Sequence, residues 1–109
     1  MLARAGMDVY HADEGEVGLT LIRTYNYDLI LLDLYLPDMS GHKVLRQIRL
    51  TGMSTPVLIL SGDDSTESKL KAFGFGADDY LTKPFHREEL IARIRAIVQR
   101  LQGITPGIP

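Results

Sequence analysis

The chain has 109 residues and no cysteine, and its 12 lysines and arginines stand against 14 aspartates and glutamates, so the formal charge is −2 with the three histidines neutral. This predicts one small globular domain, excludes a disulfide scaffold, a thiol nucleophile and a cysteine zinc site, and favours a reducing cytoplasm. No apolar run approaches the ~18 residues that a membrane span needs, no signal peptide opens the chain, and the near-neutral charge argues against nucleic-acid binding by this domain itself.

The first half of the chain alternates between strand and helix patterns. Residues 1–5 predict the last turn of a helix, and residues 8–12 are a strand candidate. Residues 15–24 predict a helix with one apolar face. Residues 28–34 form an almost unbroken apolar run, which predicts a strand buried on both faces, as in a parallel sheet covered by helices.

The second half continues the alternation. The expected elements are a helix capped by Ser40 that ends near Leu50, a strand over residues 56–60, a helix capped by Asp64 or Ser65 that ends near Phe73, a strand over residues 79–82 and a final amphipathic helix. The final helix has the clearest period, carried by Leu90, Ile91, Ile94, Ile97, Val98 and Leu101. Four strand-then-helix units in succession predict an α/β fold: an open parallel sheet with helices on both faces.

Ligands of such sheets bind outside the carboxyl ends of the strands, where this sequence places Asp33, Ser61 and Lys83. Taken singly, each has an ordinary explanation: a loop cap, a turn residue and a surface boundary. Together they offer a carboxylate, a hydroxyl and an ammonium group at neighbouring strand ends. This combination favours phosphoryl chemistry, because an aspartate can form an acyl phosphate and the other two groups can bind its oxygens.

Three ordered segments carry a family resemblance. Residues 28–41, 55–62 and 76–85 resemble the receiver domain of two-component response regulators, and residues 76–94 resemble the OmpR/PhoB class, including an alphaproteobacterial cell-cycle regulator. The resemblance implies a flavodoxin-like (CheY-like) parallel sheet. It also implies an N-terminally truncated receiver over residues 1–102, with residues 103–109 as a linker or disordered tail.

The resemblance assigns roles to the strand-end residues. Asp33 matches the phospho-acceptor, which takes its phosphoryl group from a sensor histidine kinase or a histidine phosphotransferase. Ser61 matches the switch hydroxyl, Lys83 the active-site lysine, and Tyr80 the aromatic side chain that changes rotamer. Lys83-Pro84 stands at the position of a cis peptide bond. The family is a signalling domain, so no enzyme acting on external substrates is expected.

The metal site and the sheet are both expected to be incomplete. Asp33 and the backbone carbonyl of Tyr35 match ligands of Mg²⁺, but the first strand of the family, which ends in an acidic pair, has no counterpart, and neither Asp8 nor Asp13 can replace that pair. Magnesium binding is therefore expected to be weak or absent. In the order 2-1-3-4-5 the absent strand lies between residues 8–12 and 29–32, so we expect either direct pairing of these two strands or a strand or helix exchanged with a neighbouring chain.

The resemblance also implies an output face. Lys69 with Glu89, and Asp79 with Arg93, match ion pairs across the dimer of the OmpR/PhoB class; the alternative is that they are ordinary solvated charges. A homodimer or a strand-exchanged oligomer is expected, with transcription regulation and DNA binding only through a C-terminal effector.

The sequence leaves one alternative function open, and it gives the three histidines no special role. A degenerate receiver that works without phosphorylation, as a dimerisation or protein-interaction module, is the alternative function. His11, His42 and His86 share no metal-ligand spacing, so exposed or capping roles are expected for all three.

Overall fold

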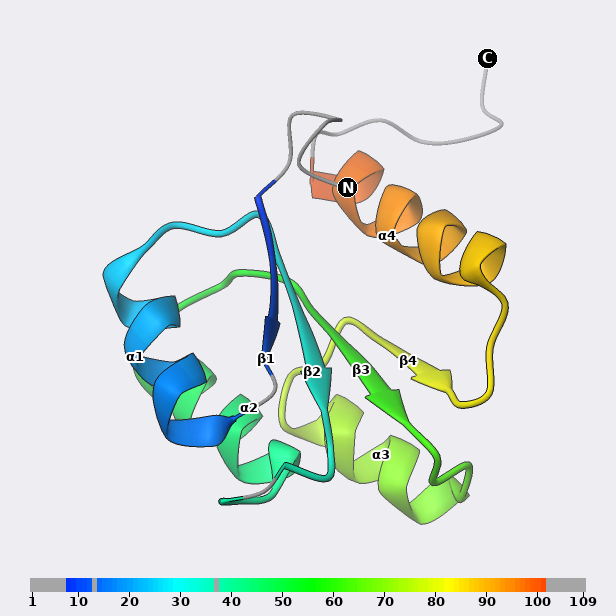
Figure 1. The fold of residues 1–109 in the computed structure, drawn as a ribbon, viewed down its shortest axis with the longest axis horizontal. Coiled ribbons are helices and arrows are strands. Elements are labelled where there is room, and N and C mark those ends of the chain that lie inside the picture. Colours follow the sequence, from blue (N-terminus) through cyan, green and yellow to red (C-terminus); the bar gives the residue numbers. More distant parts are fainter. Residues whose placement is uncertain (1–7, 13, 37, 102–109) are drawn as a thin grey trace.

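The computed structural model describes residues 8–12, 14–36 and 38–101, and within them four strands alternate with four helices (Figure 1). The elements are β1 (Val9–Ala12), α1 (Gly15–Thr24), β2 (Leu29–Asp33), α2 (Gly41–Leu50), β3 (Val57–Ser61), α3 (Thr66–Gly74), β4 (Asp79–Thr82) and α4 (Arg87–Leu101). Every predicted strand and helix within these ranges is present, with boundaries that agree with the prediction or differ from it by one residue. The predicted helical turn at residues 1–5 and the tail at residues 103–109 lie outside the described residues.

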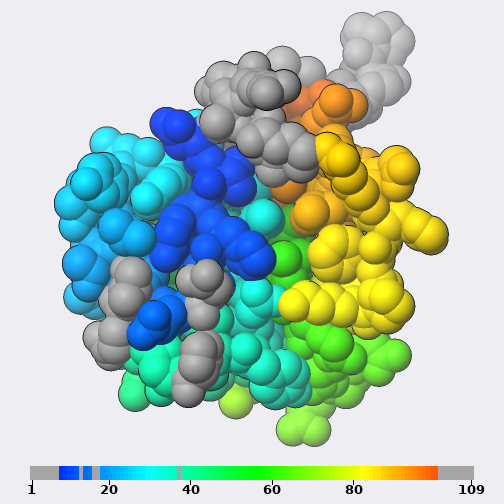
Figure 2. Space-filling view, viewed as in Figure 1, coloured from blue at the N-terminus to red at the C-terminus, as the bar shows by residue number. Residues whose placement is uncertain are grey.

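The sheet is parallel throughout and its strands follow chain order, β1-β2-β3-β4. β1 pairs directly with β2, in a register that sets Val9 beside Leu29 and Ala12 beside Leu32. Direct pairing, one of the two expected ways of closing the gap, is thus the arrangement observed. β1 ends the sheet on one side, and part of this strand lies at the molecular surface (Figure 2).

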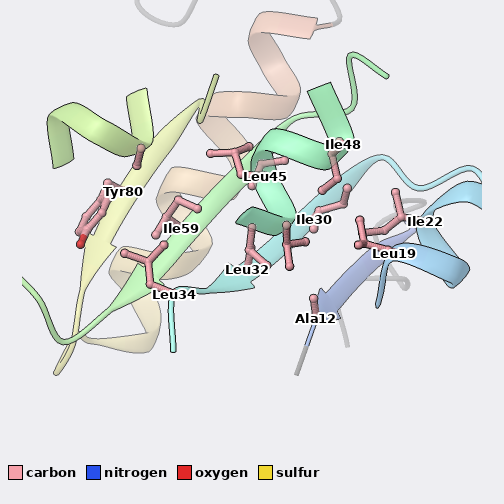
Figure 3. Packing of buried hydrophobic residues seen from close by; sticks show 13 residues of the cluster. Ala12, Leu19, Ile22, Ile30, Leu32, Leu34, Leu45, Ile48, Ile59 and Tyr80 are labelled. Atoms are coloured by element: carbon pink, nitrogen blue, oxygen red, sulfur yellow. The ribbon is translucent and has the colours of Figure 1, made fainter. Parts of the chain in front are cut away.

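The two faces of the sheet are covered unequally. Helices α1, α2 and α3 lie on one face and α4 lies on the other (Figure 1). Successive strand residues point to opposite faces, so Ile30 and Leu32 join the first cluster while Leu29 and Leu31 join the second. Figure 3 shows the first cluster, in which side chains of α1 and α2 meet those of β2 and β3. Burial of each such side chain contributes about 1.5–3 kcal/mol relative to exposure.

Serine side chains begin two of the helices that cover the larger cluster. The Ser40 hydroxyl accepts a hydrogen bond from His42 N at 3.1 Å and caps α2. The Ser65 hydroxyl accepts from Ser68 N at 3.2 Å and caps α3, so Ser65 rather than Asp64 is the cap. Each cap satisfies an amide that has no partner within its helix. Among the described residues, no helix is both long enough and apolar enough to cross a membrane.

Candidate functional site

Asp33 ends β2 at the carboxyl edge of the sheet, and two nitrogen groups from other elements hold its carboxylate. Lys83 Nζ lies 2.5 Å from Oδ1, and His11 Nε2 lies 2.8 Å from Oδ2. Lys83 is 50 residues away in sequence but follows β4 directly, so the parallel order of the strands brings it to the same edge. The Asp33 side chain is only 17% exposed, which strengthens both contacts.

The surroundings of Asp33 favour its ionised form. Burial by itself raises the pKa of the carboxyl, but hydrogen bonds from Lys83 and His11 and their positive charges lower it, and the net shift is downward. An ionised carboxylate has no proton to donate, so Nε2 of His11 carries the hydrogen of the contact with Oδ2. Asp33 therefore presents a negatively charged, oriented oxygen pair.

Gly41 allows the loop after Asp33 to pack closely against the end of β2. Gly41 N donates to Leu34 O at 2.8 Å, and a Cβ atom at Gly41 would collide with the backbone carbonyl of Asp33. Only a residue without a side chain allows this approach. The start of α2 is thereby fixed directly beside Asp33.

Ser61 lies at the same edge of the sheet, but its hydroxyl faces another partner. It ends β3, is 2% exposed, and its Oγ accepts a hydrogen bond from Asp63 N at 3.0 Å. Within the part of the chain that the structure describes, no hydrogen bond joins Ser61 to Asp33. The Ser61 backbone carbonyl instead accepts from Lys83 N at 2.7 Å, and the Lys83-Pro84 peptide bond is cis.

Tyr80 points inward from β4. Its side chain is 6% exposed, and its hydroxyl donates to the Asp63 carbonyl at 2.5 Å and lies 2.9 Å from Ser68 Oγ. Ser61 and Tyr80 therefore both bind the backbone of Asp63, one through its amide and the other through its carbonyl. This shared residue links the hydroxyl near the site to the buried aromatic ring.

The described residues do not fit a site for a hard divalent cation. Mg²⁺ prefers six oxygen ligands, usually with more than one carboxylate or phosphate among them. Asp33 has both oxygens engaged by nitrogen donors, and Asp8 lies before β1 at the opposite end of the strands, where its amide binds Asp28. No group of three or more histidine or acidic side chains within the described ranges could hold a metal. Asp13 lies outside those ranges.

Tyr35 exposes its side chain rather than burying it against the site. The ring is 74% exposed, and its hydroxyl lies 3.4 Å from an Asp63 carboxylate oxygen, whose negative charge raises the pKa of the phenol. Its backbone pairs with Ser40 in an isolated antiparallel bridge.

The residues of the expected dimer face interact within the chain. Arg93 donates to both carboxylate oxygens of Asp79, at 3.0 and 3.2 Å, and lies 3.5 Å from Glu89. The Lys69 ammonium lies 6.0 Å from the centre of the Tyr80 ring. Pairing of these residues across a dimer remains a prediction.

His11 is exposed, as the sequence predicts, but it has a partner that the sequence did not indicate. Its imidazole binds the carboxylate of Asp33. The signal was the alternation of β1 and β2, since the register sets His11 beside Leu31 and Asp33 follows two residues later on the same face. This register depends on direct pairing of β1 with β2. His42 packs edge-on against Phe75, where burial lowers its pKa, and the His86 carbonyl accepts from the first turn of α4.

Comparison with known proteins agrees with this geometry. Residues 1–95 match the response regulator receiver domain family, and the chain belongs to that family. Over 103 residues, or 94% of the chain, it is 58% identical to the cell cycle response regulator CtrA of Brucella ovis, and equally to that of Brucella abortus. The chain spans 44% of the length of these relatives.

Solved receiver domains have the same fold. The receiver domain of the Francisella response regulator 1452 is 44% identical with a TM-score of 0.78, covering 83% of this chain and 74% of that one. A two-component response regulator from Clostridium difficile is 32% identical with a TM-score of 0.82, covering 92% and 82%. The expected CheY-like receiver fold is confirmed.

Proposed function

We propose that this receiver accepts a phosphoryl group on Asp33 from a phosphohistidine of a sensor histidine kinase or a histidine phosphotransferase. The observation that carries the proposal is the ionised Asp33 carboxylate, oriented by Lys83 at 2.5 Å at the carboxyl edge of the sheet. A carboxylate oxygen attacks phosphorus, the N–P bond of the donor breaks, and its electron pair returns to the donor imidazole. Lys83 then offsets the charge of the acyl phosphate.

The switch is proposed to run through Asp63. The acyl phosphate at Asp33 carries nearly two negative charges, about one more than the carboxylate it replaces, and up to three further acceptor oxygens. A rotamer change that carries Ser61 Oγ toward these oxygens would release the Asp63 amide, which it now binds at 3.0 Å. The Tyr80 hydroxyl donates to the carbonyl of the same residue, so a shift of Asp63 would alter the hydrogen bond that keeps the Tyr80 ring in place. Phosphorylation thus biases two states of one fold.

The response to phosphorylation is proposed to require a longer protein, of the kind that the curated relatives are. We propose a receiver over residues 1–102 with residues 103–109 as linker, a homodimer whose contacts include Lys69 with Glu89 and Asp79 with Arg93, and transcription regulation through a C-terminal DNA-binding effector. The names of the relatives, cell cycle response regulators, support a regulatory role. A signalling domain of this kind acts on itself and has no external substrate. Magnesium binding at Asp33 and the Tyr35 carbonyl is proposed to be weak at most.

A second candidate is favoured by one observation. Both oxygens of Asp33 are already bound, one of them by His11, so the carboxylate could serve to fix β1 against the rest of the sheet. The domain would then act without phosphorylation, as a dimerisation or protein-interaction module.

Phosphoryl transfer from a small donor distinguishes the two candidates. Incubation with acetyl phosphate should add the mass of one phosphoryl group to the intact chain, and the product should be labile to hydroxylamine. Asp33→Asn should abolish the addition, whereas Asp64→Asn, an exposed aspartate of the next loop, should leave it unchanged. Lys83→Ala should slow it by about 100-fold, because one charged donor to the reacting group is lost, while Lys43→Ala should not. Absence of the adduct on the wild-type chain would favour the interaction module.

A further inference from the structure

Two nitrogen groups from opposite sides hold the Asp33 carboxylate. Lys83, just beyond β4, takes Oδ1, and His11, on β1, takes Oδ2. β1 and β4 are the two outer strands of the sheet, so the carboxylate is the point where side chains from both edges meet. Each oxygen has a donor within 2.8 Å.

No group of three or more histidine or acidic side chains within the described ranges could hold a cation, and two carboxylates of the loops at this edge of the sheet have partners of their own. Asp38 Oδ1 accepts from Gly15 N at 2.7 Å, and Asp63 binds the Ser65 amide and the Tyr35 hydroxyl. A cation at the ~2.1 Å distance that Mg²⁺ requires would have to share an oxygen with His11 or Lys83, or displace one of them, and would gain a single carboxylate.

We infer that the imidazole of His11 takes the place of a divalent cation at Asp33: His11 and Lys83 together hold the carboxylate, and His11 keeps magnesium from binding there. His11 is a positioning residue, because it fixes the rotamer of Asp33 through Oδ2. This inference concerns the site of the proposed function, but it is tested by metal binding alone, so either can fail without the other.

The position of His11 makes a gain-of-function test possible. His11 lies on an edge strand and its side chain is 53% exposed, so a polar substitution should leave the fold intact. Aspartate is shorter than histidine, so His11→Asp would set a second carboxylate on the same face as Asp33 with room for a cation between the two. His86→Asp, at an exposed histidine before α4, adds the same charge away from the site.

Paramagnetic broadening by Mn²⁺ in ¹H–¹⁵N spectra measures the binding. The wild-type chain and His86→Asp should show no saturable broadening centred on the amides of residues 32–34 at millimolar Mn²⁺. His11→Asp should show this broadening, with an apparent Kd at least about tenfold below the Mn²⁺ concentration at which the wild type still shows none, and the double variant with Asp33→Asn should lose it. Saturable broadening at residues 32–34 in the wild type that Asp33→Asn removes would overturn the inference, as would equal binding by His11→Asp and His86→Asp.

The imidazole ¹⁵N resonances of His11 provide a second test that leaves the histidine itself unchanged. The imidazole ¹⁵N resonances of His11 should shift in Asp33→Asn while those of His86 stay in place, because only His11 loses a hydrogen-bond partner. Addition of millimolar Mg²⁺ to the wild type should leave the His11 resonances unmoved. A saturable shift of His11 with Mg²⁺ would mean that the cation displaces the imidazole, and would contradict the inference.

Discussion

At the scale of single residues, the chemistry of Asp33 is set by its neighbours. The carboxyl is largely buried, which disfavours its charge, yet Lys83 and His11 each donate to one oxygen and reverse that effect. The result is a carboxylate whose pKa lies below its ordinary value and whose two oxygens are both oriented by donors.

The lowered pKa of Asp33 gives a prediction for acid stability. A group whose folded-state pKa lies below its unfolded value of 3.8 contributes stability above that value, and loses it as the pH falls through the folded pKa. The free energy of unfolding of the wild type should therefore fall more steeply than that of Asp33→Asn between about pH 5 and pH 2. Urea unfolding at a series of pH values measures both. Parallel curves would show that the pKa of Asp33 is the same in both states.

At the scale of elements, Arg49 joins α2 to the loops at the amino ends of β3 and β4. Its guanidinium donates to the carbonyls of Met53, Thr55 and Gly76 at 2.7–3.1 Å and lies 3.1 Å from Asp78 Oδ2. The planar fork of arginine matches several acceptors at once. Gly76 takes a φ of 104°, which brings its carbonyl to this fork at little conformational cost.

Removal of the Arg49 guanidinium should destabilise the domain without changing the contacts of Asp33. Arg49→Met keeps much of the aliphatic stem but leaves three carbonyls without this donor and Asp78 Oδ2 with only the Val57 amide, so a loss of about 2 kcal/mol is expected in chemical denaturation. Arg46→Met, at an exposed arginine on the same helix, should change stability by less than about 0.5 kcal/mol. A similar loss in both variants would show that helix propensity, not the fork, is responsible.

At the scale of the whole molecule, the pairing of β1 decides how the sheet ends. β1 has only four residues and one neighbour, and its outer edge carries backbone groups that no strand of the described sheet pairs with. Such an edge is a template for another chain. Direct pairing with β2 and exchange between chains place the same residues side by side and differ only in connectivity.

Mixed isotopic labelling separates the two connectivities. A sample of ¹³C-labelled and unlabelled chains, unfolded and refolded together, should give no intermolecular contacts between Tyr10 and Ile30, because the structure pairs them within one chain. Contacts within uniformly labelled chains should persist on dilution. Intermolecular contacts at this pair would establish strand exchange instead.

Much of the fold could be predicted from the chain. β2 and α4 were both predicted from the spacing of apolar residues. A strand buried on both faces has a continuous apolar run, whereas a helix buried on one face has apolar residues three or four positions apart. The convergence of Asp33 and Lys83 also followed, since parallel strands bring their carboxyl ends to one edge. Ser61 was placed at the right edge, but the partner of its hydroxyl, Asp63, depends on the turn that follows and could not be predicted.

The sequence by itself determined the elements, the parallel sheet and the family, because these depend on spacings and residue types that lie close together along the chain. Only the tertiary structure decided that β1 lies against β2, and with that register it decided that His11 binds Asp33. The register depends on pairing between residues 20 apart, such as His11 with Leu31, and a shift of one residue would turn His11 to the other face. The partners of a carboxylate are therefore set by how strands pair, which local sequence patterns do not specify.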